Sequence, residues 1–305
     1  MTADDVGGVA LTPPTSIAGP PGGRLGRFAP FLPAGFILVG LFFVPLLVMV
    51  AYSFWTTNAN LDVVPIWTLK NYENFFKNAT YVRTLIKTLL IGSAVTVTAL
   101  VMAFAVAYFL ARYVSRRWAR VALLVIIVPF WTSYLLRVYS WQAILGEKGV
   151  LNQVLMGLGL IREPSSLFVY NDVGTFIVLT YVYLPFAALV LYATLDRFDF
   201  TQLTAAQDLG ARPDQAFRHV LLPQIRPGLI TASILVLIPI LGEYLTPAMV
   251  GGASGLLIAN LIANFFKNAL FSEGAAVGLM IVALVTLLLI AFRRYLRVED
   301  VYARG

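Results

Sequence analysis

The chain has 305 residues, of which 59% are hydrophobic and only 12% are charged, and its formal net charge is +7. Soluble globular domains carry roughly 25% charged residues, so this composition excludes a chain that exposes most of its surface to water. Cysteine is absent, which excludes disulfides and thiolate metal sites, and the single histidine, His219, argues against a histidine-based metal site. The composition predicts one all-α integral membrane domain.

The first 30 residues differ from the rest of the chain. Residues 1–30 are rich in proline and glycine and show no apolar periodicity, so they predict a disordered cytoplasmic tail. The apolar run that follows is too long for the central region of a signal peptide. It also has no convincing small-residue cleavage site, so we expect no cleaved leader.

Six segments are long and apolar enough to cross a membrane, because about 20 helical residues span the hydrocarbon core. We place them at residues 31–54, 84–110, 121–145, 173–195, 229–250 and 275–292. The third is the least regular, since Pro129 interrupts it and Arg137 lies inside it. These spans predict a membrane domain over residues 31–295, with its core at 84–292 and a cytoplasmic tail at 296–305.

Basic residues are distributed unevenly between the loops that these spans define. With the N-terminus in the cytoplasm, most arginines lie on the inner side, and acidic residues offset most basic residues outside. The positive-inside rule therefore predicts that both termini are cytoplasmic, as an even number of spans requires. The inner arginines are Arg24, Arg27, Arg112, Arg116, Arg117, Arg120, Arg197, Arg212, Arg218, Arg226, Arg293, Arg294, Arg297 and Arg304.

Small side chains recur at every fourth position of the second span, at Ala99, Ala103, Ala107 and Ala111. Small residues at this spacing allow two membrane helices to approach closely. The pattern fits packing within the chain, and it also fits an interface with a second subunit.

The connection between the fourth and fifth spans, residues 196–229, is unusually long for a cytoplasmic connection. Its first part predicts a short helix with Thr201 or Thr204 as the N-cap. Gly210 is the expected residue after the helix end, in a left-handed conformation.

The second part of this loop predicts another short helix. Pro213 suits its first turn, and we expect Pro223 and Pro227 to end it. Its apolar stripe consists of Ala216, Phe217, Val220 and Leu221. From periodicity alone, the two helices rest on lipid headgroups, pack on the ends of the chain's own helices, or dock on a soluble partner.

Several residues of this loop resemble the signature loop of ABC-importer permeases, which runs from Glu-Ala-Ala through Gly and Phe to Leu-Pro and Pro-Gly. The resemblance covers spans two to six, with the first span as an N-terminal addition. Thr204 stands where the family usually has Glu, which removes a carboxylate from the expected contact with the ATPase. The matching residues are Ala205, Ala206, Gly210, Ala211, Phe217, Leu222, Pro223, Pro227 and Gly228.

The resemblance implies a permease subunit in the bacterial inner membrane that is not itself an enzyme. In that family the first short helix is a coupling helix, which sits in a cleft of the ATP-binding subunit. The expected coupling residues are Thr204, Ala205, Ala206, Gly210, Ala211, Phe217 and Pro223.

The same resemblance implies the partners of the chain. They are a second, homologous permease, two ATP-binding subunits and an extracytoplasmic solute-binding protein. The chain has no phosphate-cradling GxxxxGK[ST] loop, so ATP and Mg²⁺ belong on the partner ATPase. The basic residues flank membrane spans, which fits anionic lipid rather than nucleic acid.

Two further stretches, residues 128–152 and 241–252, resemble the polyamine-type branch of these permeases, which also includes importers of opines and aminophosphonates. A carboxylate within a membrane span is costly and marks a functional hypothesis, so Glu243 either attracts an ammonium group or holds the structure together. Aromatic faces near Arg137 either hold a cation or form an interfacial belt. The candidates for the solute pathway are Glu243, Tyr244, Trp131, Tyr134, Arg137 and Tyr139.

Two other classes of protein remain compatible with the sequence. A secondary transporter works without an ATPase and usually shows internal repeats, and no clear repeat is present here. A membrane scaffold that transports nothing uses the same loop only for docking. Co-purification of an ATPase and solute-stimulated ATP hydrolysis separate these classes from an importer.

Overall fold

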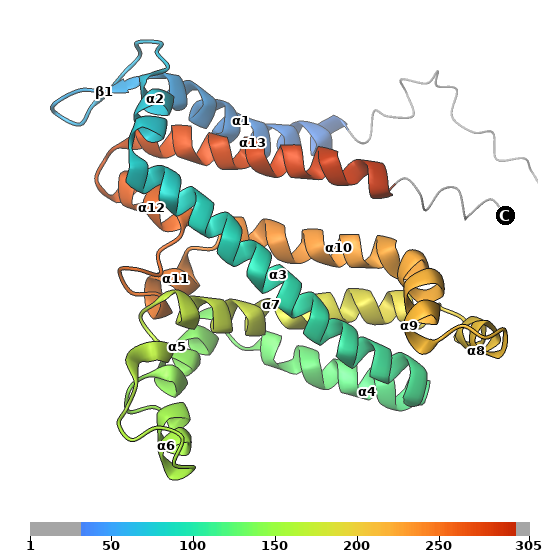
Figure 1. Cartoon of the computed structure of the whole chain (residues 1–305). Helices are drawn as coiled ribbons and strands as arrows, with labels where there is room; N and C mark the ends of the chain where they lie inside the picture. Colours follow the sequence, from blue (N-terminus) through green and yellow to red (C-terminus); the bar gives the residue numbers. More distant parts are fainter. Residues whose placement is uncertain (1–31, 297–305) are drawn as a thin grey trace, which may run out of the picture. The chain divides into compact units, whose positions relative to one another are not determined.

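The computed structural model describes residues 32–296. The predicted tail at 1–30 lies outside this part, as does the predicted tail at 296–305 except for Leu296, which is the last residue of the final helix. Helices dominate the described chain (Figure 1). The chain divides into two units, Met1–Val48 and Met49–Gly305. Helix α1 (Leu32–Phe54) begins in the first unit and ends in the second, and it contains Pro45. Its bounds agree with the first predicted span.

Three long helices form the core of the second unit. Helix α3 (Ala79–Tyr113) packs along α7 (Asp172–Leu195), and α10 (Leu222–Leu241) packs against both. Ala99, Ala103 and Ala107 are fully buried within this single chain. The alanine stripe therefore serves packing within the chain, because no second subunit is needed to cover it.

The third predicted span is not one continuous helix. Helix α4 (Arg116–Ile127) tightens into a 3₁₀ turn (Val128–Trp131), and α5 (Tyr134–Leu145) follows. The stretch Arg116–Trp131 is bent by 94° relative to Tyr134–Gly157. Thr132 is extended at the break. Pro129 has no N–H for the helical ladder, and the Thr132 hydroxyl bonds its carbonyl oxygen at 2.6 Å.

The fifth span, predicted at residues 229–250, is a helix from Pro213 to Leu241 in the structure. It therefore begins and ends earlier than expected. Pro223 and Pro227 do not end the second loop helix, because helix continues from Pro213 to Leu241. Helix α9 (Pro213–Ala216) leads into a π turn (Phe217–Leu221), and then into α10. The N–H of Leu222 bonds the carbonyl of Phe217 in this wider turn, which carries the ladder past the first proline.

Helix α10 ends at Leu241, with Gly242 as its C-cap. A separate short helix, α11 (Leu245–Val250), follows. Glu243 therefore lies in a helix break rather than inside the fifth span. Helix α12 (Ile258–Lys267) and the long α13 (Phe271–Leu296) complete the chain. The last helix includes the sixth predicted span.

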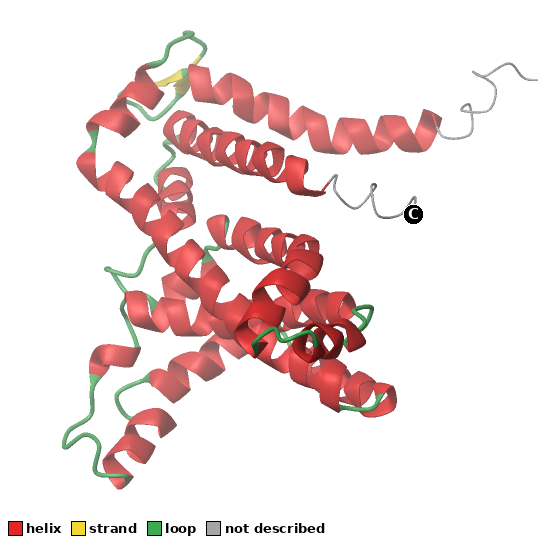
Figure 2. Ribbon diagram, turned by 45° about the vertical axis from the view of Figure 1, so that its right-hand side comes forward, coloured by secondary structure: helices red, strands yellow, loops and turns green. Residues whose placement is uncertain are grey.

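The second unit also contains several short elements. Strands β1 (Thr56–Thr57) and β2 (Val63–Val64) form an antiparallel hairpin, drawn in yellow in Figure 2. Helix α2 (Lys70–Lys77) follows it. Further along the chain lie α6 (Val150–Gly157) and a 3₁₀ turn at Ser166–Phe168.

Four described helices are long and apolar enough to cross a membrane, and the bent pair of α4 and α5 raises the number to five. The four are Ala79–Tyr113, Asp172–Leu195, Pro213–Leu241 and Phe271–Phe292. A shorter apolar stretch, Val39–Phe54, belongs to α1. The fold is thus a multi-span helical membrane protein.

The contact between α10 and α7 depends on a missing side chain at Gly228. A Cβ atom there would lie 2.8 Å from the Cβ of Thr194, a clash that no change of rotamer relieves. We expect Gly228→Val to destabilise the protein by about 1–3 kcal/mol, as overpacking of a tight core does. The measurement is the Tm of the purified protein.

The matched control is Gly157→Val, because a Cβ at Gly157 meets nothing within 4 Å. This control is expected to keep the wild-type Tm. Equal Tm values for the two variants would contradict the proposed close approach of α10 and α7.

Candidate functional site

The predicted cytoplasmic loop, residues 196–229, contains helix α8 (Thr201–Asp208). Asp199, rather than a threonine, accepts the bonds at its start. The carboxylate of Asp199 accepts the Thr201 hydroxyl at 2.7 Å and the Thr201 N–H at 3.0 Å, and these bonds hold the pKa of Asp199 below its ordinary value. The prediction that Thr201 or Thr204 caps the helix was wrong, because Thr201 is the first helical residue.

Gly210 ends α8 in the predicted manner. Its φ is +92°, in the left-handed region. The N–H of Gly210 bonds the carbonyl of Gln207 at 2.9 Å, and the N–H of Ala211 bonds that of Ala206 at 3.0 Å, which is the Schellman pattern. A Cβ at Gly210 meets nothing within 4 Å, so the requirement for glycine here is conformational.

One apolar residue anchors α8 and another projects from its end. Leu203 is buried, whereas Thr204 and Ala205 are exposed and Ala206 is half-buried. Leu209 is 89% exposed. Leu203 was not among the predicted residues, although its spacing to Ala206 is typical of a helix face. The loop thus presents a small, partly apolar surface.

A chain of aromatic rings links this loop to α3. The rings of Phe217 and Phe104 lie 5.8 Å apart, and Tyr108 contacts both Phe104 and Phe200 at 5.7 Å. Such edge-to-face and tilted pairs stabilise packing. These ring contacts therefore pack the loop against α3.

The loop is also bonded directly to α10. The amide of Gln224, next to Pro223 in the first turn of α10, donates to Gln202 of α8 at 2.6 Å. Ala211 is half-buried at the turn between α8 and α9. The predicted coupling residues thus lie within one connected structure that joins two core helices.

The helix break after α10 forms the second candidate site. Glu243 caps α11, because one carboxylate oxygen accepts the N–H groups of Leu245 at 3.1 Å and Thr246 at 3.3 Å. The other oxygen accepts the Tyr183 hydroxyl at 3.2 Å. Thr246 in turn shares a 2.6 Å hydrogen bond with the Tyr134 hydroxyl. This network joins α5, α7 and the break, and its carboxylate carries a negative charge when ionised.

The structure brings together only some of the predicted pathway residues. Tyr134 joins the Glu243 network, and Arg137 lies over the Tyr134 ring, with its guanidinium carbon 5.4 Å from the ring centre. Tyr244 points elsewhere, since its hydroxyl accepts Lys267 at 3.0 Å. Trp131 and Tyr139 are exposed. Tyr183 was missed by the sequence analysis, because no local pattern shows which residue of another helix faces Glu243.

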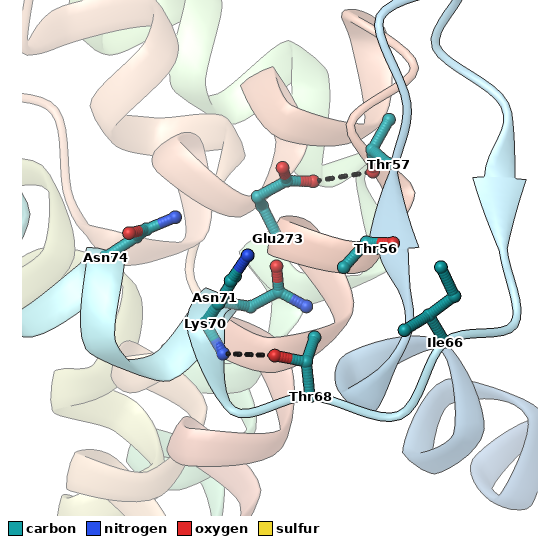
Figure 3. A pocket seen from close by; sticks show the side chains of 8 residues that line it. All are labelled: Thr56, Thr57, Ile66, Thr68, Lys70, Asn71, Asn74 and Glu273. Atoms are coloured by element: carbon teal, nitrogen blue, oxygen red, sulfur yellow. Dashed lines mark hydrogen bonds between the residues drawn. The ribbon is translucent and has the colours of Figure 1, made fainter.

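A polar hollow of about 370 Å³ lies at the predicted outer side, between β1, α2 and the first turn of α13. Figure 3 shows Glu273 facing Thr57, whose hydroxyl donates to the carboxylate at 3.0 Å. Lys70 and Asn71 border the same hollow. Among the described residues, no cluster of histidine, aspartate and glutamate fits a metal ion.

Comparison with known proteins places these features in a family. Residues 103–298 match the family described as "Binding-protein-dependent transport system inner membrane component". The chain is 33% identical to the spermidine/putrescine transport system permease protein PotB of Escherichia coli, over 84% of this chain and 93% of the relative. PotB of Haemophilus influenzae is 32% identical, over 84% and 89%.

Solved structures share the fold. A bacterial alginate ABC transporter, in complex with alginate pentasaccharide-bound periplasmic protein, has a chain that matches with a TM-score of 0.68 at 15% identity, covering 89% of this chain and 95% of that one. The MetNI methionine ABC transporter matches with a TM-score of 0.50 at 22% identity, over 71% and 94%. The loop, the multi-span fold and these matches agree that the chain belongs to the binding-protein-dependent inner-membrane components, the permease subunits of ABC importers.

Proposed function

We propose that this chain forms half of the translocation pathway of an ATP-driven importer for a polyamine such as putrescine or spermidine. The observation that carries this proposal is the 33% identity to a spermidine/putrescine permease over 84% of the chain. The alternative solutes are an opine or an aminophosphonate. A putative 2-aminoethylphosphonate permease, PhnU of Salmonella choleraesuis, is 27% identical over 83% of the chain. Membership of the importer family argues against a secondary transporter.

The chain crosses the membrane six times in this proposal. The crossings are α1, α3, the bent pair of α4 and α5, α7, the helix from Pro213 to Leu241, and α13. Six crossings place both termini on one side, and the distribution of arginine makes that side the cytoplasm. The loop containing α8 then faces the ATPases.

The proposed assembly contains a second, homologous permease, two ATP-binding subunits and an extracytoplasmic binding protein. ATP and Mg²⁺ are held by the ATP-binding subunits, and lipids surround the permeases. The exposed face of α8, with Thr204, Ala205 and Leu209, is the proposed contact with one ATPase. The polar hollow beside Glu273 lies on the side where the binding protein docks.

The long helix from Pro213 to Leu241 supplies the mechanical connection in this mechanism. Its inner end is bonded to α8 through Gln224 and Gln202, and its outer end leads into the break that contains Glu243. When nucleotide-driven closure of the ATPases moves α8, this helix moves with it. The Glu243 network then rearranges, and the pathway alternates between outward-open and inward-open states.

Transport of labelled solute tests the proposal directly. Proteoliposomes that contain the complete importer and its binding protein are expected to take up labelled spermidine or putrescine only when ATP is enclosed with the ATPases. Unlabelled polyamine competes for uptake, whereas 2-aminoethylphosphonate does not. Competition by the aminophosphonate alone would assign the other solute class.

The coupling role of the loop depends on the left-handed turn at Gly210. We expect Gly210→Val to reduce ATP-driven uptake about tenfold, because a β-branched residue there costs roughly 1–2 kcal/mol and shifts α8. Gly210→Asn is expected to retain most uptake, since asparagine tolerates this conformation. The measurement is uptake at equal amounts of assembled complex, and equal uptake by both variants would refute the role.

The carboxylate of Glu243 is the proposed attraction for a cationic solute. Glu243→Gln keeps an oxygen that caps α11 but removes the charge, so uptake of spermidine should fall at least about tenfold, which is about 1.4 kcal/mol. Tyr183→Phe is the matched control, because it removes one hydrogen bond and keeps the charge. If the carboxylate is purely structural, Glu243→Gln will transport spermidine as well as Tyr183→Phe does.

A further inference from the structure

Arg137 on α5 has buried hydrogen-bond donors for which the described residues provide no acceptor. Its Nε and Nη1 atoms are buried without a hydrogen-bond partner among the described residues. The guanidinium carbon lies 4.3 Å from the centre of the Phe130 ring and 5.4 Å from that of Tyr134. These rings contact the faces of the cation, whereas its N–H donors lie in the guanidinium plane. A charged donor taken from water needs an acceptor, so this site is suited to an anion.

A hollow of about 430 Å³ adjoins Arg137, between the 3₁₀ turn, α5 and α7. Pro129, Leu136 and Ile144 give it an apolar lining. The Thr132 and Ser140 hydroxyls also border it, but they already donate to backbone carbonyls at 2.6 and 2.8 Å. Trp141 and Tyr181 line it as well, and Arg137 is the one charged residue among the described residues that line this mainly apolar space.

The position of this hollow along the spans indicates its depth. From Arg116, at the predicted inner end, to Trp131 the chain rises about 24 Å as a helix. From Leu195, at the inner end of α7, back to Tyr181 in the hollow is about 21 Å. In a hydrocarbon core of about 30 Å, both estimates place the hollow in the outer half, a few ångströms below the outer headgroups.

A bend of 94° separates Arg116–Trp131 from Tyr134–Gly157. If the first stretch crosses the membrane as in the proposed orientation, the second runs along the membrane plane at this depth. Its surroundings resemble a membrane interface, since Trp131 is 88% exposed and Tyr139 is 53% exposed. Leu136 beside the hollow is 62% exposed. A flexible arginine side chain at this depth reaches toward the headgroups.

We propose that Arg137 binds the phosphate of an anionic phospholipid of the outer leaflet, and that an acyl chain of this lipid lies against Leu136 and Ile144. The planar guanidinium matches two phosphate oxygens, and the apolar lining of the hollow matches the hydrocarbon chain. A carboxylate of the second permease offers the same charge, but the apolar lining and the exposed aromatic residues favour lipid. The proposal rests on the membrane orientation given above and is independent of the solute.

Counting the retained lipids tests this site. The complete importer is purified in mild detergent, and native mass spectrometry gives the number of phospholipids bound to each complex. We expect Arg137→Gln to lose one phospholipid per chain relative to the wild type. The matched control is Arg162→Gln in an exposed outer loop, which is expected to retain the wild-type number.

Arg137→Lys is a second variant, which keeps the charge but loses the planar fork. Its retention should lie between those of the wild type and Arg137→Gln. If Arg137→Gln does not fold, the comparison of Arg137→Lys with the wild type still tests the site. Equal retention by the wild type and both Arg137 variants would overturn the proposal.

Lipid composition separates a phospholipid from a protein carboxylate. In nanodiscs, addition of phosphatidylglycerol to phosphatidylcholine should raise the Tm of the wild-type complex, and this rise should disappear in Arg137→Gln. Loss of the second permease from Arg137→Gln in both compositions, with unchanged lipid retention, would instead identify a protein carboxylate and overturn the proposal. Failure of polyamine uptake by the wild type leaves these measurements unaffected, so the two proposals fail separately.

Discussion

Every backbone donor and acceptor at membrane depth must find its partner inside the protein, because hydrocarbon offers none. Long helices meet this requirement by themselves, and the structure of this permease depends on how it is met where helices are interrupted. At the first interruption, the Thr132 hydroxyl bonds the carbonyl of Pro129. At the second, Glu243 accepts the first two N–H groups of α11. Both interruptions occur where the candidate sites lie.

The predicted cytoplasmic loop follows the same physical rule at the end of a helix. The Schellman bonds at Gly210 and Ala211 satisfy the last carbonyls of α8, and the π turn at Phe217–Leu221 keeps the ladder intact before Pro223. As a result, a segment with several prolines remains helical from Pro213 to Leu241. A continuous helix of this length connects the predicted inner surface with the break at Glu243. This continuity gives the proposed coupling mechanism a physical basis.

Two charged residues of the membrane region have opposite environments. The carboxylate of Glu243 accepts hydrogen bonds from Tyr183 and from backbone N–H groups within the chain. Arg137 is stacked on aromatic rings, while two of its nitrogen atoms have no hydrogen-bond partner among the described residues. The first therefore has a structural role within the chain, and its attraction for a cationic solute belongs to the proposed function. The second suits contact with a group outside the chain.

The sequence by itself determined the membrane class, the approximate positions of the long helices, the turn at Gly210 and the family. These features depend on local composition, on helix length and on motifs of adjacent residues. The packing role of Ala99, Ala103 and Ala107 needed the structure, because a small-residue stripe does not show which helix covers it. The same holds for the persistence of helix through Pro223, which depends on a π turn without a sequence signature. Only the tertiary structure decided that Tyr134 and Tyr183 belong to the Glu243 network. It also decided that Trp131 and Tyr139 are exposed instead. Such contacts depend on how helices that are distant in the sequence pack and where they bend.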